Sequence, residues 1–227
     1  MLILLAGALP GGAASAETPA PKVYNTHTKE RATIVFKRDG KYDKAGLAKM
    51  NQFLRDWRRN EPTKMDPKLL DLVWSVYQKS GSDDYISVVC GYRSASTNSA
   101  LRKRSKGVAK NSQHVQGKAL DFFIPGVPIA TLRAIGLRAQ VGGVGFYPSS
   151  NFVHMDTGSV RHWPKMSRQQ LVKVFPNGKT LHVPSDGKPL PGGLTDRPGL
   201  VTTDCPARRR PRGEVGRPSA SRGSSSP

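Results

Sequence analysis

Two short apolar segments carry polar side chains at alternate positions, and this pattern constrains the fold more than any other feature of the chain. Residues 118–124 place Asp121 among apolar neighbours, and residues 151–157 place His154 and Asp156 two positions apart. Side chains two residues apart on a strand point to the same face. We therefore expect both segments to be strands of one sheet, with Asp121 and His154 converging on one point.

His114 lies in the polar loop before the first of these strands and can reach the same point. A carboxylate in an apolar strand is costly to bury unless a cation or several donors meet it. Imidazole and carboxylate are ordinary zinc ligands, and three protein ligands with an open fourth position are typical of a catalytic zinc. His114, Asp121 and His154 are thus candidate ligands of one zinc ion per chain, although an isolated histidine is more often a hydrogen-bonded core residue.

Apolar spacing and capping residues predict an α+β domain with a small, mostly antiparallel sheet flanked by helices. Asp66 and Pro67 suit an N-cap and a first helical turn, and Gly81 suits the C-terminal end of that helix. The expected helices are 43–58, 66–80, 95–104, 128–139 and 167–174, and the expected strands are 31–36, 85–91, 118–124, 142–147 and 151–157.

Three motifs in order along the chain resemble one family. They are Gly91-Tyr92-Arg93-Ser94 with Asn98; Ser112, His114, Gly117, Ala119 and Asp121 in the pattern S-x-H-x-x-G-x-A-x-D; and the strand from Phe152 to Asp156. This combination resembles the zinc D-Ala-D-Ala metallopeptidases, which share a fold with the hedgehog signalling domain. The similarity is greatest to the YcbK-like murein endopeptidases, and it covers about residues 30–175.

The resemblance implies a function and roles for individual residues. It implies zinc ligands at His114, Asp121 and His154, and a catalytic or substrate-binding role for Arg93, whose planar guanidinium suits carboxylates and oxyanions. Ser112 is a second candidate for substrate binding, or it holds the loop that presents His114. The implied activity is a zinc metallopeptidase that hydrolyses amide bonds in peptidoglycan stem peptides, with endopeptidase action on crosslinks preferred to carboxypeptidase action.

The chain departs from the family where many relatives place the catalytic base. Asn151 and Phe152 stand at positions where relatives carry a carboxylate or a histidine, and neither can accept a proton. Asp156 is our candidate base, because a carboxylate beside a zinc-bound water can accept its proton, and His162 is the alternative. A third possibility is a zinc-containing module that binds cell wall or a protein partner without catalysis.

The ends of the chain suggest export. Residues 1–16 form an apolar run that ends in an A-x-A signature, which predicts a signal peptide truncated at its start. Residues 17–28 are expected to be a polar lead-in, 29–187 the metallopeptidase domain, and 188–227 a disordered basic tail. The expected location is the periplasm or cell envelope, and we expect no membrane span in the mature chain.

Charge and the remaining residue types complete the prediction. A net charge of +20 suits an anionic partner such as peptidoglycan. Aromatic and basic residues do not alternate along the chain as they do in proteins that bind single-stranded nucleic acids, so we expect no nucleic-acid partner. The expected assembly is a monomer.

Cys90 is expected to be a buried free thiol rather than paired with Cys205. His27 and His182 lie in polar segments and are expected to be exposed to solvent.

Overall fold

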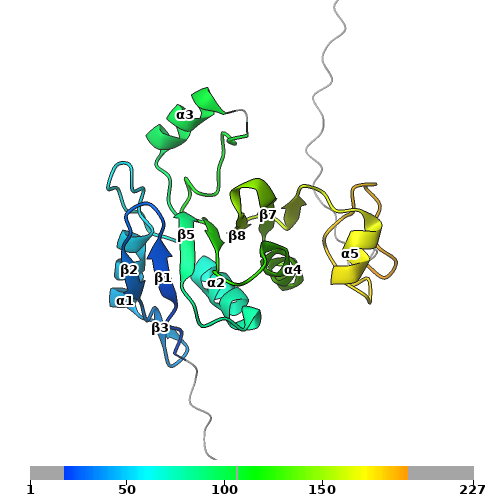
Figure 1. Cartoon of the computed structure of the whole chain (residues 1–227), viewed down its shortest axis with the longest axis horizontal. Helices are drawn as coiled ribbons and strands as arrows, with labels where there is room; N and C mark the ends of the chain where they lie inside the picture. The colour runs from blue at the N-terminus through cyan, green and yellow to red at the C-terminus, as the bar shows by residue number, and fades with distance from the viewer. Residues whose placement is uncertain (1–17, 106, 194–227) are drawn as a thin grey trace, which may run out of the picture. The chain divides into compact units, whose positions relative to one another are not determined.

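The computed structural model of the protein describes residues 18–105 and 107–193, which form an α+β domain (Figure 1). Its main sheet has seven strands in the order β2-β1-β5-β6-β8-β7-β9. The strands are β1 (Lys22–Asn25), β2 (Arg31–Thr33), β5 (Ile86–Cys90), β6 (Ala119–Phe123), β7 (Gly143–Tyr147), β8 (Phe152–Asp156) and β9 (Arg161–Trp163). A separate two-stranded sheet pairs β3 (Lys37–Arg38) with β4 (Lys41–Tyr42).

The main sheet is mixed, with antiparallel pairs in the majority. The pairs β1·β5 and β7·β9 are parallel, whereas β1·β2, β5·β6, β6·β8 and β7·β8 are antiparallel. The expected α+β class and the mostly antiparallel sheet are therefore confirmed.

The helices follow the capping residues of the sequence. They are α1 (Lys44–Phe53), α2 (Pro67–Ser80), α3 (Ala95–Arg104), α4 (Ile129–Ala139) and α5 (Arg168–Val174), with a short 3₁₀ turn η1 (Pro148–Ser150). Asp66 caps α2 by accepting from the Lys68 backbone N–H, and Gly81 ends the helix at φ 69°. Only a residue tolerant of the left-handed region fits that position without strain.

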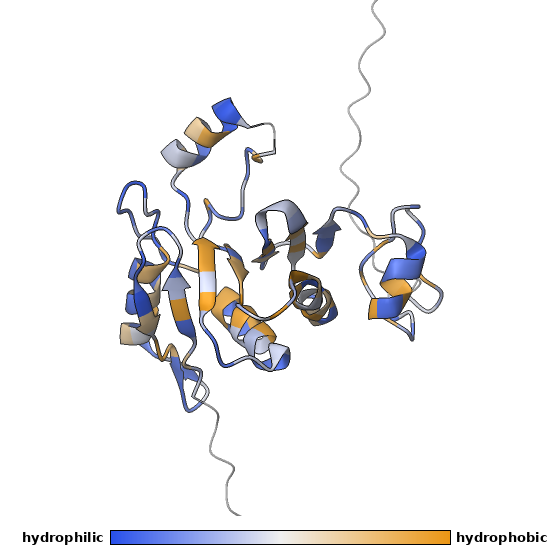
Figure 2. Ribbon diagram, viewed as in Figure 1, coloured by the Kyte–Doolittle hydropathy of each residue, from blue (hydrophilic) through white to orange (hydrophobic). Residues whose placement is uncertain are grey.

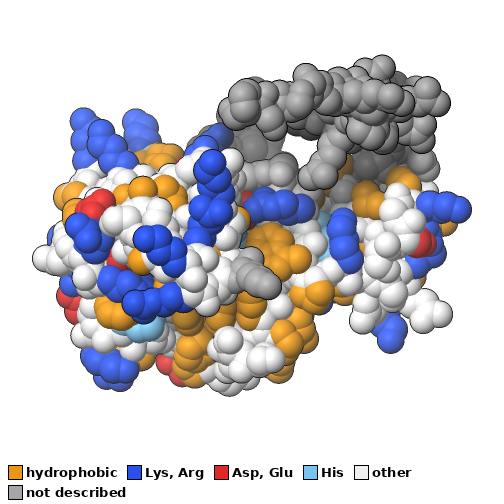
Figure 3. Space-filling model, turned by 90° about the horizontal axis from the view of Figure 1, so that it is seen from above, with side chains coloured by type: hydrophobic (Ala, Val, Ile, Leu, Met, Phe, Trp, Pro, Cys, Tyr) orange, Lys and Arg blue, Asp and Glu red, His pale blue; other side chains and the backbone are white. Residues whose placement is uncertain are grey.

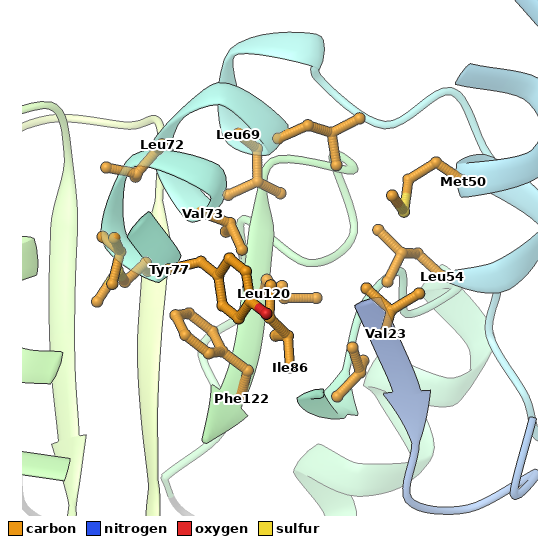
Figure 4. Close-up of a cluster of buried hydrophobic side chains, with 14 of the residues drawn as sticks. Val23, Met50, Leu54, Leu69, Leu72, Val73, Tyr77, Ile86, Leu120 and Phe122 are labelled. Atoms are coloured by element: carbon orange, nitrogen blue, oxygen red, sulfur yellow. The ribbon is translucent and has the colours of Figure 1, made fainter. Parts of the chain in front are cut away.

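One face of the sheet is covered by α2 and α4, and the apolar core lies there (Figures 1 and 4). Leu120 and Phe122 of β6 point into this core, where they meet Leu69 and Val73 of α2. Figure 2 shows the hydropathy of the residues, and the hydrophobic ones, in orange, are concentrated on β5 and the elements beside it. Because side chains alternate along a strand, Asp121 points to the opposite face, away from the two helices.

The structure extends the domain beyond its expected boundaries. Strand β1 lies inside the segment that we expected to be a polar lead-in, and Val23 and Asn25 are buried where β1 pairs with β5. At the other end, Leu190 is 1% exposed and packs with Leu171 of α5, so the segment from 188 on begins inside the fold. The sequence did not indicate these boundaries, because one or two buried side chains in a polar segment are too few to form a periodic pattern of hydrophobic residues.

The expected signal peptide and Cys205 lie outside the described residues. In the described ranges, no helix combines the length and the apolar character needed to cross a membrane.

Candidate active site

The site is built on a row of residues that runs across five strands. Asp121 on β6 lies directly opposite His154 on β8, with Cys90 of β5 on the other side of Asp121. Beyond His154, the row continues through Gly145 of β7 to Trp163 of β9. Cross-strand neighbours bring their side chains within about 5 Å of one another, so the sheet itself positions the polar groups of this row.

His114 completes the cluster from the loop between α3 and β6. Its Nε2 lies 3.3 Å from Asp121 Oδ2 and 3.2 Å from His154 Nδ1, and His154 Nδ1 lies 2.7 Å from Asp121 Oδ1. His114 is 3% exposed and His154 6%. The structure thus brings together the three residues that the sequence analysis named as candidate zinc ligands.

The hydrogen bonds around the two rings determine which nitrogens carry protons. His114 Nδ1 lies 2.8 Å from the Gly91 carbonyl oxygen, which can only accept, so Nδ1 carries the proton. His154 Nε2 lies 2.9 Å from Asp156 Oδ2, so Nε2 carries the proton there. In the neutral rings the two nitrogens that face Asp121 are therefore bare. Three acceptors converge on one point, and this arrangement requires a cation.

The protonation equilibria in the metal-free cluster show the same demand for positive charge. Burial by itself would lower the pKa of His114, but the neighbouring Asp121 and Cys90 outweigh burial and raise this pKa well above its ordinary value. Burial would raise the pKa of Asp121, yet its interactions with His114 and His154 hold the pKa well below the usual range. Without a metal, a proton supplies the charge.

The donor atoms fit a zinc ion. Tetrahedral zinc with bonds of about 2.0–2.1 Å separates its ligand atoms by about 3.3 Å. The two imidazole nitrogens lie 3.2 Å apart, and the Asp121 carboxylate presents Oδ1 to His154 at 2.7 Å and Oδ2 to His114 at 3.3 Å. The ligand atoms of Cys90, His114 and Asp121 also lie within 4.8 Å of one another, which defines an overlapping set that contains sulfur. We favour the set with His154, because its bare nitrogen faces the other two donors.

Asp156 is fully buried and has every oxygen engaged. Besides His154, it accepts hydrogen bonds from the backbone N–H groups of Gly143 (3.0 Å) and Gly158 (2.8 Å). Arg161 donates to both of its oxygens, at 3.0 and 2.6 Å. Burial opposes ionisation, but these partners hold the pKa of Asp156 well below its usual range. The contacts suit a residue that orients His154, whereas the base that we expected from the sequence needs a free oxygen; that assignment stays a prediction.

His162, the alternative base, points away from the site. It follows Arg161 and precedes Trp163 on β9, so it faces the other side of the sheet, where its Nε2 accepts from the Met166 backbone N–H. Its ring lies 5.2 Å from that of His182. The expectation that His182 is exposed to solvent was wrong, since only 2% of it is accessible. His27 is exposed, as expected.

A cavity of about 510 Å³ opens over the three candidate ligands. One wall consists of Arg93, Ser105 and residues of the loop 107–114, and the other of Tyr147, Phe152, Arg161 and Trp163. Asp121 is the only carboxylate among the described residues that line this cavity. Asn151 is exposed in a turn at φ 53° and does not belong to this lining.

The loop wall is held by residues of the motifs. Arg93 Nη2 donates to Ser112 Oγ at 3.3 Å, and the same oxygen accepts from the His114 backbone N–H. Asn98 donates to the backbone carbonyls of Ala109 and Lys110. Arg93 Nε is buried with no partner in the described part of the chain. Ser112 therefore couples Arg93 to the loop that presents His114, and Arg93 retains an unused donor.

The family model and the similar proteins found by comparison all carry the same description. A family model described as peptidoglycan L,D-endopeptidase MepK matches residues 13–163. The peptidoglycan L,D-endopeptidase MepK of Escherichia coli (strain K12) is 42% identical over 153 residues, which cover 66% of this chain and 84% of that protein. The probable peptidoglycan L,D-endopeptidase MepK of Haemophilus influenzae is 44% identical over 154 residues, covering 66% and 83%. No solved structure shows significant similarity.

Proposed function

The chain belongs to the peptidoglycan L,D-endopeptidase MepK family and is an endopeptidase of peptidoglycan, and on this premise we propose that it cuts L,D crosslinks with the help of one zinc ion. The proposed ligands are His114, Asp121 and His154. The observation that carries this proposal is the convergence of two bare imidazole nitrogens and one carboxylate within 3.3 Å of one another. When bound, zinc lowers the pKa of a water molecule toward about 7 and polarises the scissile carbonyl group.

The surrounding residues orient the ligands. The Gly91 carbonyl holds His114 through Nδ1, and Asp156 holds His154 through Nε2. Such outer contacts fix the ring orientation and increase the basicity of the ligand nitrogens. We propose that Asp156 is a positioning residue, because its pair with Arg161 would have to break before it could accept a proton.

Arg93 is the proposed substrate-binding residue. Stem peptides carry free carboxylates, which a guanidinium binds through parallel hydrogen bonds. Arg93 lines the cavity beside His114, where its Nη2 donates to Ser112 Oγ, whereas Arg161 is committed to Asp156. Ser112 would position Arg93 through its hydroxyl oxygen.

The charge of the chain fits a polyanionic substrate. Figure 3 shows Lys and Arg side chains spread over one face of the molecule, with few Asp or Glu among them. The sequence as a whole carries a net charge of +20. Since the substrate lies outside the cytoplasm, we also propose export to the periplasm through the apolar segment 1–16.

A digest of purified muropeptide dimers tests this proposal. Metal-free protein would be incubated with L,D-crosslinked or D,D-crosslinked dimers, with and without zinc, and the products separated and weighed by mass spectrometry. We expect zinc-dependent conversion of the L,D dimer to monomers, slow or no cleavage of the D,D dimer, and no cleavage by His154→Ala. An intact L,D dimer in the presence of zinc-loaded protein would refute the proposed specificity.

A further inference from the structure

The wall opposite Arg93 is aromatic, and a glycine makes room for it. A Cβ atom on Gly145 would lie 2.7 Å from the indole of Trp163. Because Gly145 has no side chain, the indole lies against β7 at this position, and its centroid is 5.0 Å from that of the His154 ring. The indole therefore forms the edge of the cavity immediately beside a candidate metal ligand.

Tyr147 extends this wall along the same face of the sheet. It follows Gly145 by two positions, so both point to the cavity side, and it is the cross-strand partner of Phe152. The Tyr147 and Phe152 rings stack, with centroids 4.6 Å apart. Trp163 Nε1 donates to the Tyr147 hydroxyl oxygen at 2.8 Å. Two contacts thus fix the position of one phenol group.

The direction of the bond from Trp163 leaves the phenol with an unused donor. An indole N–H can only donate, so the Tyr147 oxygen is the acceptor and its own O–H remains available. No residue in 18–105 or 107–193 accepts a hydrogen bond from this hydroxyl. Phe152 covers one face of the ring, and the hydroxyl hydrogen lies near the ring plane, so an acceptor approaches at the edge of the ring. Tyr147 is among the residues that line the cavity, so a bound substrate can supply this acceptor.

We propose that the Tyr147 hydroxyl donates a hydrogen bond to a carbonyl or carboxylate oxygen of the peptide stem and helps to determine which stem the enzyme accepts. This inference rests on the proposed function. Arg93 and Tyr147 would bind the substrate from opposite walls, with the metal ligands between them. Trp163 is then a positioning residue, which holds the phenol oxygen where the substrate meets it.

Tyr147→Phe tests the donor directly, because it keeps the ring that stacks on Phe152 and removes the hydroxyl. Removing one partner of a hydrogen bond between enzyme and substrate leaves the other partner unpaired in the site, and this lowers the affinity for the substrate. We expect kcat/KM for the crosslinked dimer to fall about 10–100-fold, with KM carrying at least half of the loss on a logarithmic scale. Zinc affinity and the melting temperature should stay at wild-type values. Tyr85→Phe, which removes a hydroxyl at the far end of β5, is the matched control and should leave kcat/KM unchanged.

Binding of an uncrosslinked stem peptide to the zinc-loaded protein, measured by calorimetry, gives a readout independent of turnover. We expect Tyr147→Phe to weaken this binding by about the factor by which KM rises. Trp163→Phe, which removes the indole N–H together with part of the ring, should weaken it about 3–10-fold. Wild-type binding and kcat/KM in Tyr147→Phe would overturn the inference, as would a loss that follows reduced zinc content. Absence of any hydrolysis by the wild-type protein would instead refute the proposed function, while the binding comparison would still decide the role of Tyr147.

Discussion

Two pairs of histidines in this protein have nearly the same geometry and opposite chemistry. The rings of His114 and His154 lie 5.0 Å apart at 71°, and those of His162 and His182 lie 5.2 Å apart at 81°. All four residues are at most 6% exposed. Burial and ring contact therefore do not distinguish a metal site from a core cluster.

The neighbours of each pair make the difference. Asp121 and Asp156 contact the first pair, and the pKa of His114 rises well above its ordinary value although burial opposes this. The second pair lies near Phe175, and burial with nearby positive charge lowers the pKa of both rings to about 4. Carboxylates convert a buried histidine pair into a site for a cation, whereas burial beside basic groups keeps such a pair neutral.

The largest expected effect comes from removing one ring of the first pair, and the same kind of change in the second pair serves as its control. In His154→Ala, the metal loses one of three ligands, so we expect zinc content to fall from one per chain to near zero and activity to fall at least about 10³-fold. His182→Gln is the matched variant from the other pair and should keep its zinc and its activity. Metal analysis after dialysis and the muropeptide digest measure both effects; full zinc content in His154→Ala would contradict the ligand assignment.

Asp156→Asn separates positioning from proton transfer. A carboxylate that orients a ligand ring typically affects metal affinity by about 10–100-fold, so we expect zinc to dissociate that much more readily and activity to return at saturating zinc. Chelator competition and initial rates give the two quantities. If zinc affinity stays unchanged while kcat collapses, Asp156 is the base that the sequence analysis named.

Acid should weaken zinc binding before it affects the second pair. Zinc displaces the proton held by His114, and the raised pKa of His114 means that this competition begins above pH 6.5. The apparent zinc affinity should then fall by up to about tenfold per pH unit as the pH decreases toward 6. Zinc titrations at several pH values would show this slope, and a constant affinity between pH 8 and pH 6 would contradict it.

The smallest effect concerns the stability of the metal-free protein. His162 and His182 titrate at about 4 in the folded state and near 6.5 when unfolded, so their contribution is complete above pH 6.5 and is lost as the pH falls toward 4. Each should contribute about 1–3 kcal/mol to this loss. His114 has a raised pKa, so its contribution is complete below its unfolded value and is lost as the pH rises. Urea denaturation of the wild type and of a variant with His162→Gln and His182→Gln should show a shallower acid decline in the variant.

The contrast between the pairs also shows what the sequence could reveal. Alternation along two apolar strands correctly predicted that Asp121 and His154 share a face, because the period of a strand is a local property. The N-cap at Asp66 and the C-terminal Gly81 are local signals in the same sense. His114 was named from its position in the loop just before β6, and the family motifs supported it. Arg93, which lies in a loop where no period applies, came from the family motifs alone.

Other contacts depend on tertiary pairing and could not be predicted. Strand β9 has three residues, too few for an alternating pattern, so neither the Arg161 pair with Asp156 nor the place of Trp163 over Gly145 was foreseen. His182 stands in a polar segment, yet it is buried beside His162 and Phe175, and its Nε2 lies 3.2 Å from the Leu137 carbonyl oxygen of α4. Contacts between short segments that are distant in the sequence produce no local sequence pattern from which they could be predicted.

X-ray absorption spectroscopy of the zinc-loaded protein tests the central claim most directly, because it reads the ligands themselves. We predict one zinc per chain with nitrogen and oxygen neighbours at about 2.0–2.2 Å, imidazole scattering from two histidines, and no sulfur. The spectrum of Cys90→Ser should be identical to that of the wild type. A sulfur neighbour at about 2.3 Å that disappears in Cys90→Ser would show that zinc uses the overlapping Cys90 set, and the role assigned here to His154 would then be wrong.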